Sequence, residues 1–140
     1  MSFLLDTNVV SEIRRRERAD PGVRTWFDQA DEDALFLSVL VLGEVRQGAE
    51  RKRHSDAAAA RSLERWLESL VDVYGDRVLP IDQRVAERWG RLNASDPLPV
   101  VDGLIAATAL VHDLTVVTRN ERDFRRTGAK VMNPFARAAR

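Results

Sequence analysis

The sequence contains no cysteine, which excludes a disulfide framework, a zinc–thiolate centre and a thiol nucleophile. It also lacks a charge imbalance, because 22 basic residues face 22 acidic ones, and this argues against binding nucleic acid by bulk charge. No apolar stretch approaches the roughly 20 residues of a membrane helix, and the short apolar run near the N-terminus does not resemble a signal peptide. We therefore expect a cytoplasmic protein without a membrane partner.

Short apolar runs and helical stretches alternate along the 140 residues, of which 44% are hydrophobic. This alternation predicts an α/β fold, in which helices cover a central, mostly parallel sheet of four or five strands. The length suits one domain spanning residues 1–140. The expected strands are Phe3–Leu5, Leu35–Leu37, Val78–Ile81, Thr115–Val117 and Lys130–Met132.

The helices are predicted from apolar spacing and from capping residues. Ser38 and Asp82 are expected N-caps, and Pro21 suits the first turn of a helix. The expected helices run from about Val9 to Arg18, from Pro21, from Val39 to Arg51, from Ala57 to Val73, from Asp82, and from Val101 to His112.

Asp6 directly follows the first predicted strand. In open parallel sheets, ligands bind at the carboxyl ends of the strands, so Asp6 is a candidate site residue. Thr118 and Asn120 follow the strand Thr115–Val117 and are expected at the same edge, although such residues are also common in turns. The sequence therefore predicts a polar site at this edge.

Two further acids have two interpretations each. Asp102 lies in the first turn of a predicted helix, where a carboxylate gains from the helix dipole whether or not it has another role. Glu44 lies among apolar residues at the start of another helix. It either borders buried surface, where it needs a cation, a metal or hydrogen-bond donors, or points to solvent and pairs with a basic residue.

If these carboxylates meet, they need a cation, because clustered anions repel one another. Oxygen ligands suit Mg²⁺ or Mn²⁺, and the absence of cysteine and of a paired-histidine motif argues against zinc. An acidic pocket holding such an ion fits phosphodiester hydrolysis.

Four motifs resemble those of the PIN-domain ribonucleases, and in particular the VapC toxins of type II toxin–antitoxin systems in their FitB-like branch. They are LLDTNVVSE at Leu4–Glu12, SVLVLGEVRQGAE at Ser38–Glu50, DGLIAATAL at Asp102–Leu110 and VVTRNERDF at Val116–Phe124. The resemblance covers essentially the whole chain. It implies a three-layer α/β/α domain and Mg²⁺-dependent endonucleolytic cleavage of RNA, with Mn²⁺ as a further candidate ion.

The resemblance also implies roles for individual residues. Asp6, Asp102 and Glu44 would be catalytic acids and metal ligands. Asn120 stands where many family members have a fourth acid, so Asp123 is a secondary catalytic candidate. The supporting residues would be Thr7 and Asn8, which would orient Asp6, and Thr118, which would hydrogen-bond within the site, together with Asn120.

The implied partners are an RNA substrate, a VapB-type antitoxin and a second copy of the chain, with larger assemblies on operator DNA as a further expectation. Arginines occur in clusters, one of which comprises Arg14, Arg15, Arg16 and Arg18. Such clusters suit phosphate contacts, or are simply solvated helix faces. We expect RNA contacts from Arg14, Arg15, Arg46 and Arg119.

Two other functions deserve comparison. A haloacid-dehalogenase-like phosphatase also places an aspartate after its first strand, but it needs a second aspartate two residues later, where this chain has Asn8, and a later lysine, for which only Lys52 and Lys130 are available. A catalytically silent PIN-like binding module is the other alternative. The retention of Asp6, Glu44 and Asp102 argues against it.

Overall fold

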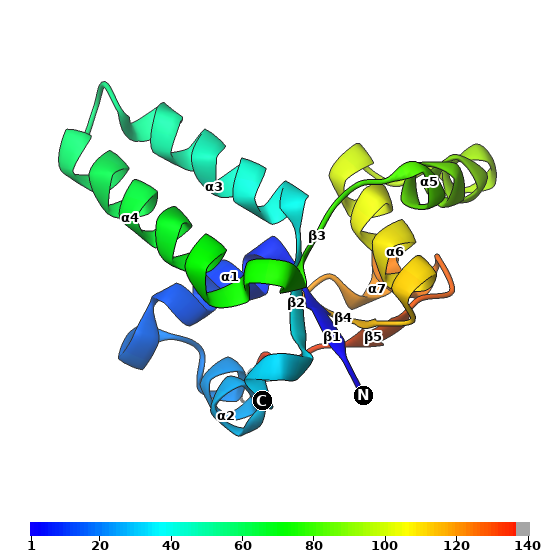
Figure 1. Cartoon of the computed structure of the whole chain (residues 1–140). Helices are drawn as coiled ribbons and strands as arrows, with labels where there is room; N and C mark the ends of the chain where they lie inside the picture. The colour runs from blue at the N-terminus through cyan, green and yellow to red at the C-terminus, as the bar shows by residue number, and fades with distance from the viewer. Residues whose placement is uncertain (137–140) are drawn as a thin grey trace.

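A computed structural model describes residues 1–136 and contains one five-stranded sheet with the order β3-β2-β1-β4-β5 (Figure 1). Every neighbouring pair of strands is parallel, so the sheet is entirely rather than mostly parallel. The strands are β1 (Phe3–Leu5), β2 (Leu35–Ser38), β3 (Val78–Leu79), β4 (Thr115–Val117) and β5 (Lys130–Met132). The predicted strand Val78–Ile81 is too long, because Pro80 has no N–H to continue the ladder.

Helices pack on both faces of the sheet, as the three-layer prediction requires (Figure 1). Leu5 and Val117 point into a core with the first four helices, whereas Leu4 and Val116 point into a core with α6 and α7. This alternation follows from the two-residue period of a strand. The helices are α1 (Thr7–Arg14), α2 (Pro21–Gln29), α3 (Val39–Lys52), α4 (Ala57–Tyr74), α5 (Gln83–Ser95), α6 (Val100–His112) and α7 (Glu121–Arg125).

The predicted helix starts are confirmed by their caps. The Ser38 hydroxyl accepts a hydrogen bond from the Leu40 N–H, and the Asp82 carboxylate accepts one from the Val85 N–H. Pro21 occupies the first turn of α2. Within residues 1–136, no helix is long and apolar enough to cross a membrane.

The first helix differs from its prediction at both ends. It begins at Thr7 instead of Val9, because the Asp6 carboxylate accepts the Thr7 N–H and caps it. It ends at Arg14 instead of Arg18, and a separate 3₁₀ turn, η1 (Arg16–Arg18), follows. The chain reverses there, and the Asp20 N–H donates to the side chain of Glu12.

The short helix α7 follows β4 and lies beyond Val101–His112, which is the last helix that the sequence predicts. Five residues span little more than one turn, which is too short to show a periodic apolar pattern. The remaining 3₁₀ turns are η2 (Glu32–Ala34) and η3 (Gly75–Arg77).

Candidate active site

Asp6 lies at the carboxyl end of β1 and is only 5% exposed. Its Oδ1 accepts the Thr7 N–H at 2.9 Å, and its Oδ2 accepts the Thr118 hydroxyl at 2.8 Å and the Asn8 side-chain amide at 3.2 Å. A carboxylate offers about four lone-pair positions, so these donors leave one open. Asp6 is therefore both fixed in orientation and able to accept one further electrophilic partner.

Thr118 joins the ends of two neighbouring strands. Its side chain is fully buried, and its N–H donates to the Met132 carbonyl at 3.0 Å. Its hydroxyl accepts the Asn120 N–H at 2.9 Å and the Asn8 amide at 3.3 Å while donating to Asp6. The prediction that the segment after β4 meets Asp6 at one sheet edge is thus confirmed.

Glu44 reaches this site from α3. Its Oε1 accepts the Thr7 hydroxyl at 2.5 Å, and its side chain is half-buried. No Lys, Arg or His in residues 1–136 forms an ion pair with it. Of the two interpretations of Glu44, the structure supports the one in which it borders buried surface and receives a hydrogen-bond donor.

The acids of this edge influence one another's protonation. The pKa of Asp6 is raised to about 6, mainly by burial and also by the negative charges of Asp102 and Glu44, against the opposing hydrogen bonds from Thr118 and Thr7. Asp102, in the first turn of α6, has a pKa raised by burial and then by the charges of Glu44 and Asp123. Acids that are far apart in the sequence therefore share one electrostatic environment.

Asp123 lies on α7 at the margin of this group. It accepts the Asn120 side-chain amide at 3.1 Å and pairs with the Arg126 guanidinium at 3.0 Å. Asn120 therefore positions Asp123 instead of supplying a carboxylate of its own. The charge of Asp123 is partly balanced by Arg126, in contrast to the unpaired acids closer to β1.

These residues fit a hard divalent cation of the Mg²⁺ type. The donors are carboxylate oxygens, and in the described residues Asp6 and Asp102, like Glu44, have no basic ion-pair partner. Across positions 1–136, no three His, Asp or Glu side chains converge closely enough to form a complete ligand set. Mg²⁺ suits such a site, since it commonly binds through one or two carboxylates and keeps several waters.

The four arginines expected to contact RNA lie in three different places. Arg14 and Arg15 are at the C-terminal end of α1, and Arg46 forms ion pairs with Glu50 and Glu64 on the α3–α4 pair. Arg119 is next to the acidic site, where its N–H donates to the Asn8 Oδ1 and its guanidinium lies 3.9 Å from the Phe135 ring centroid. The structure does not bring these arginines together.

The sequence interpretation missed two features that the fold creates. One is the bond between the Arg119 N–H and Asn8, which ties β4 to α1. The other is the proximity of Arg65 on α4 to the arginines that follow α1. No local motif reveals such contacts, because the residues are separated by many positions in the sequence.

A comparison with protein-family models matches residues 3–130 to the PIN domain. Toxin FitB of Neisseria gonorrhoeae is 31% identical over 138 residues, which cover 95% of this chain and 98% of that protein. The VapC ribonuclease Y4jK of Sinorhizobium fredii is 31% identical over 140 residues, covering 95% of this chain and 97% of that protein. The solved structure of FitAB bound to an IR36 DNA fragment superimposes with a TM-score of 0.84 at 29% identity and covers 98% of both chains.

Proposed function

Because residues 3–130 match its domain model, this chain belongs to the PIN-domain family, and we propose that it is a metal-dependent endoribonuclease that acts as the toxin of a type II toxin–antitoxin pair. One observation carries the proposal. The buried Asp6 carboxylate is held by three donors, and it lies close enough to Asp102 and Glu44 for their charges to raise its pKa. Such a charge cluster is costly unless it serves to bind a cation.

In this proposal Asp6 and Asp102 are the principal ligands of one Mg²⁺ or Mn²⁺ ion, and Glu44 is the third acidic residue of the metal site. When bound, such an ion supplies positive charge to a phosphate group and lowers the pKa of water. The chain's own contribution is orientation. Asn8 and Thr118 fix one carboxylate oxygen of Asp6, while the Thr7 hydroxyl fixes Glu44.

Asp123 has a secondary role in this proposal. Its ion pair with Arg126 already balances part of its charge, which favours one tightly held ion over two. Asn120 keeps Asp123 facing the site by donating to its Oδ2. Together these contacts support Asp123 as a group that acts on the solvent side of the site.

The proposed partners are RNA, a VapB-type antitoxin and a second copy of the chain, with larger assemblies on operator DNA. The support is the likeness to proteins named as a toxin and a ribonuclease, and to a FitAB structure with bound DNA. We propose that the reaction takes place in the cytoplasm, where an RNA substrate is available.

The direct test is cleavage of a fluorophore–quencher RNA by the purified chain, with Mg²⁺ and with EDTA. We expect cleavage only with the metal, and a loss of about 1,000-fold or more in the Asp6→Asn variant, since metal-assisted charge stabilisation contributes several kcal/mol. The control is Asp72→Asn, which removes the same charge from an exposed position on α4. Cleavage that persists in EDTA or in Asp6→Asn contradicts the proposal, and an inert but folded wild-type chain supports a silent binding module instead.

A further inference from the structure

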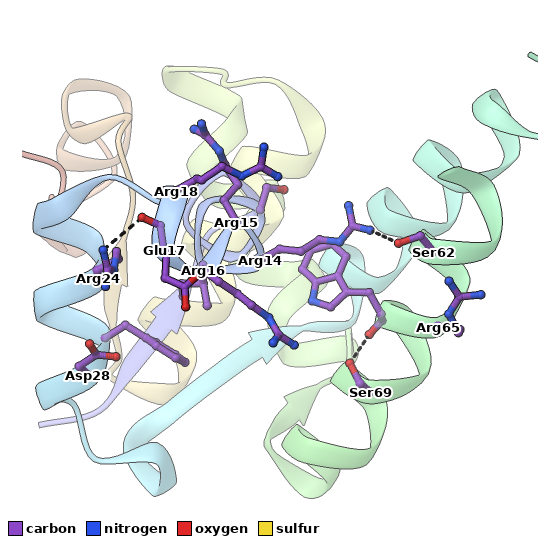
Figure 2. Close-up of a pocket in the computed structure, with 14 residues that line it drawn as sticks. Arg14, Arg15, Arg16, Glu17, Arg18, Arg24, Asp28, Ser62, Arg65 and Ser69 are labelled. Carbon is purple, nitrogen blue, oxygen red and sulfur yellow. Dashed lines mark hydrogen bonds between the residues drawn. The ribbon is translucent and has the colours of Figure 1, made fainter. Parts of the chain in front are cut away.

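A groove of about 960 Å³ lies between the C-terminal end of α1, η1, α2 and α4 (Figure 2). Its lining is strongly basic, although the chain as a whole is neutral. Two acidic side chains, Glu17 and Asp28, face six arginines. The arginines are Arg14, Arg15, Arg16, Arg18, Arg24 and Arg65.

Most of this positive charge is not neutralised by the protein. Within residues 1–136, Arg15 is the only groove arginine with an acidic partner, Glu12, at 3.1 Å. Arg14 donates to the Ser62 hydroxyl at 2.8 Å, and Arg24 donates to the Glu17 backbone carbonyl at 3.1 Å, so both contact neutral acceptors. The groove therefore concentrates positive charge that a bound polyanion can neutralise.

The other three groove arginines are still less engaged. Arg16, Arg18 and Arg65 are exposed, and their side chains make no hydrogen bond or ion pair with any other described residue. An arginine side chain left in water at a concave surface keeps its five N–H donors available for a phosphate. These three positions are thus the best-placed ligand contacts in the groove.

Arginines at the distal end of the α3–α4 pair behave differently. Arg46 and Arg53 both pair with Glu50 and Glu64, at distances between 2.8 and 3.9 Å. Other exposed arginines, such as Arg51, Arg61 and Arg84, also have no acidic partner among residues 1–136, but they lie outside the groove. The groove is distinguished because five arginines of this kind line one concave surface.

The backbone at η1 gives an independent indication of function. Arg16 has a φ of 55°, in the left-handed region that glycine or asparagine occupies more easily. Strained backbone of this kind concentrates at binding and catalytic sites. Figure 2 shows the Arg16 side chain extending from this turn into the space between α2 and α4.

We propose that this groove binds the phosphate backbone of single-stranded RNA. Five arginines without an acidic partner match the repeating charge of the backbone, and Phe27, half-buried in the same lining, offers aromatic surface for a base. The Arg14 guanidinium lies 5.1 Å from the centroid of the Trp66 ring and covers one of its faces. The aromatic surface favours RNA over an acidic peptide as the occupant. This proposal rests on the proposed ribonuclease function, because the groove would guide the RNA substrate to Asp6.

The geometry of α1 connects the groove with the acidic site. Asp6 caps the N-terminal end of α1, and Arg14 is its last residue. At 1.5 Å per residue, the two are separated by about 12 Å along the helix. An RNA strand that occupies both sites therefore spans several nucleotides, and the groove acts on affinity at a distance from the scissile bond.

The test measures RNA affinity by fluorescence anisotropy on the Asp6→Asn background, which prevents cleavage from disturbing binding. The probe is a fluorescein-labelled, mixed-sequence RNA of about 20 nucleotides. We expect the triple variant Arg16→Gln, Arg18→Gln, Arg65→Gln to bind at least tenfold more weakly at about 0.1 M salt, with a slope of log K against log salt shallower by about two, as expected for three lost phosphate contacts on a single strand.

The matched control removes the same number of positive charges from paired positions. It is the triple variant Arg53→Gln, Arg125→Gln, Lys130→Gln, whose basic side chains all have a carboxylate partner. We expect its RNA affinity to fall by less than about threefold, since only bulk charge changes. Equal losses in the two triple variants would overturn the proposal.

Two further arms separate the possible failures. Binding of a poly-glutamate peptide that depends on the groove arginines, while RNA binding does not, would overturn the proposal in favour of an acidic protein partner.

Cleavage by wild-type protein is measured in parallel. If the chain cleaves RNA but the groove variant binds like the control, the groove proposal alone fails. If the chain does not cleave RNA at all, the ribonuclease proposal fails, whatever the binding result. Circular dichroism confirms that both triple variants are folded.

Discussion

The two ends of α1 carry opposite charges in opposite environments. At the N-terminal end, Asp6 is buried and hydrogen-bonded, with Glu44 and Asp102 nearby. At the C-terminal end, Arg16 and Arg18 are exposed and have no acidic partner among residues 1–136. The helix dipole favours this polarity, because it stabilises acids at the N-terminus and bases at the C-terminus.

The two ends of α1 therefore have different expected roles: the acidic end sets the geometry of the metal site, and the basic end contributes to RNA affinity. Burial of the acid cluster is unfavourable, and the hydrogen-bond donors to Asp6 and Glu44 hold these carboxylates in place, so that a cation can be positioned accurately. Solvated arginines pay little desolvation cost, and they attract a polyanion without fixing it. We therefore expect changes at the acidic end to affect catalysis and changes at the basic end to affect binding.

The largest effect is expected for Asp102→Asn. Because Asp102 is a proposed ligand and shares the charge environment of Asp6, cleavage should fall about 1,000-fold or more. RNA affinity should stay the same or become slightly tighter, since a negative charge is lost. Parallel cleavage and anisotropy measurements check this, with Asp72→Asn as the control. A loss of RNA affinity comparable to the loss of cleavage would break the separation of the two ends.

The next largest effect is expected on the pH dependence of the free energy of unfolding in the absence of metal. Burial raises the pKa of Asp6 to about 6 from 3.8, so the folded chain holds this proton more tightly than the unfolded chain. The stabilising contribution is complete below about pH 4 and is lost as the pH rises through about 6, at a cost of about 3 kcal/mol. We expect the free energy of unfolding in EDTA to fall from about pH 4.5 to about pH 7.5 more steeply in wild type than in Asp6→Asn. Urea unfolding measures this free energy at each pH. Identical pH dependences in wild type and Asp6→Asn would refute the description of Asp6 as a buried acid with a raised pKa.

A smaller effect is expected when a supporting donor is removed. Thr118→Val deletes the hydroxyl that donates to Asp6 and should lower cleavage by about 10- to 100-fold, as is typical for residues that orient a metal ligand. Thr115→Val is the matched control, because Thr115 is also buried in β4 and its side chain makes no hydrogen bond to another described residue. Similar activities of the two variants would show that Asp6 does not need this donor.

The smallest effect is expected for Arg53→Gln. This variant breaks exposed ion pairs with Glu50 and Glu64, which typically contribute less than about 1 kcal/mol. The melting temperature should change by no more than about 3 °C. Calorimetry gives that value, and anisotropy should show RNA affinity within about twofold of wild type. A larger loss of affinity would place Arg53 in the RNA-binding surface and weaken the contrast with the groove.

The sequence predicts the layers of this fold well, because the strand runs and the caps at Ser38 and Asp82 are local signals. It predicts less well where the outcome depends on tertiary contacts. The break after Arg14 accompanies a chain reversal that brings the Asp20 N–H to Glu12, and α7 is too short to show a period.

The site residues also differ in how far the local sequence predicts them. Asp6 and Thr118 were predictable from strand ends, since parallel strands bring their carboxyl ends to one edge. Local sequence left the environment of Glu44 undecided, because its hydrogen bond with Thr7 joins residues 37 positions apart. The basic groove could not be found either, because Arg65 joins the arginines after α1 only when α4 packs beside them.

The central claim is that the acids at the N-terminal end of α1 hold a divalent ion. Isothermal titration calorimetry of Mn²⁺ into wild-type chain and into Asp6→Asn tests it most directly, with Asp72→Asn as the control. We predict one Mn²⁺ ion per chain in wild type and in Asp72→Asn, and no binding in Asp6→Asn. Equal Mn²⁺ binding by wild type and Asp6→Asn, or no binding by a wild-type chain that still cleaves RNA, would contradict the claim.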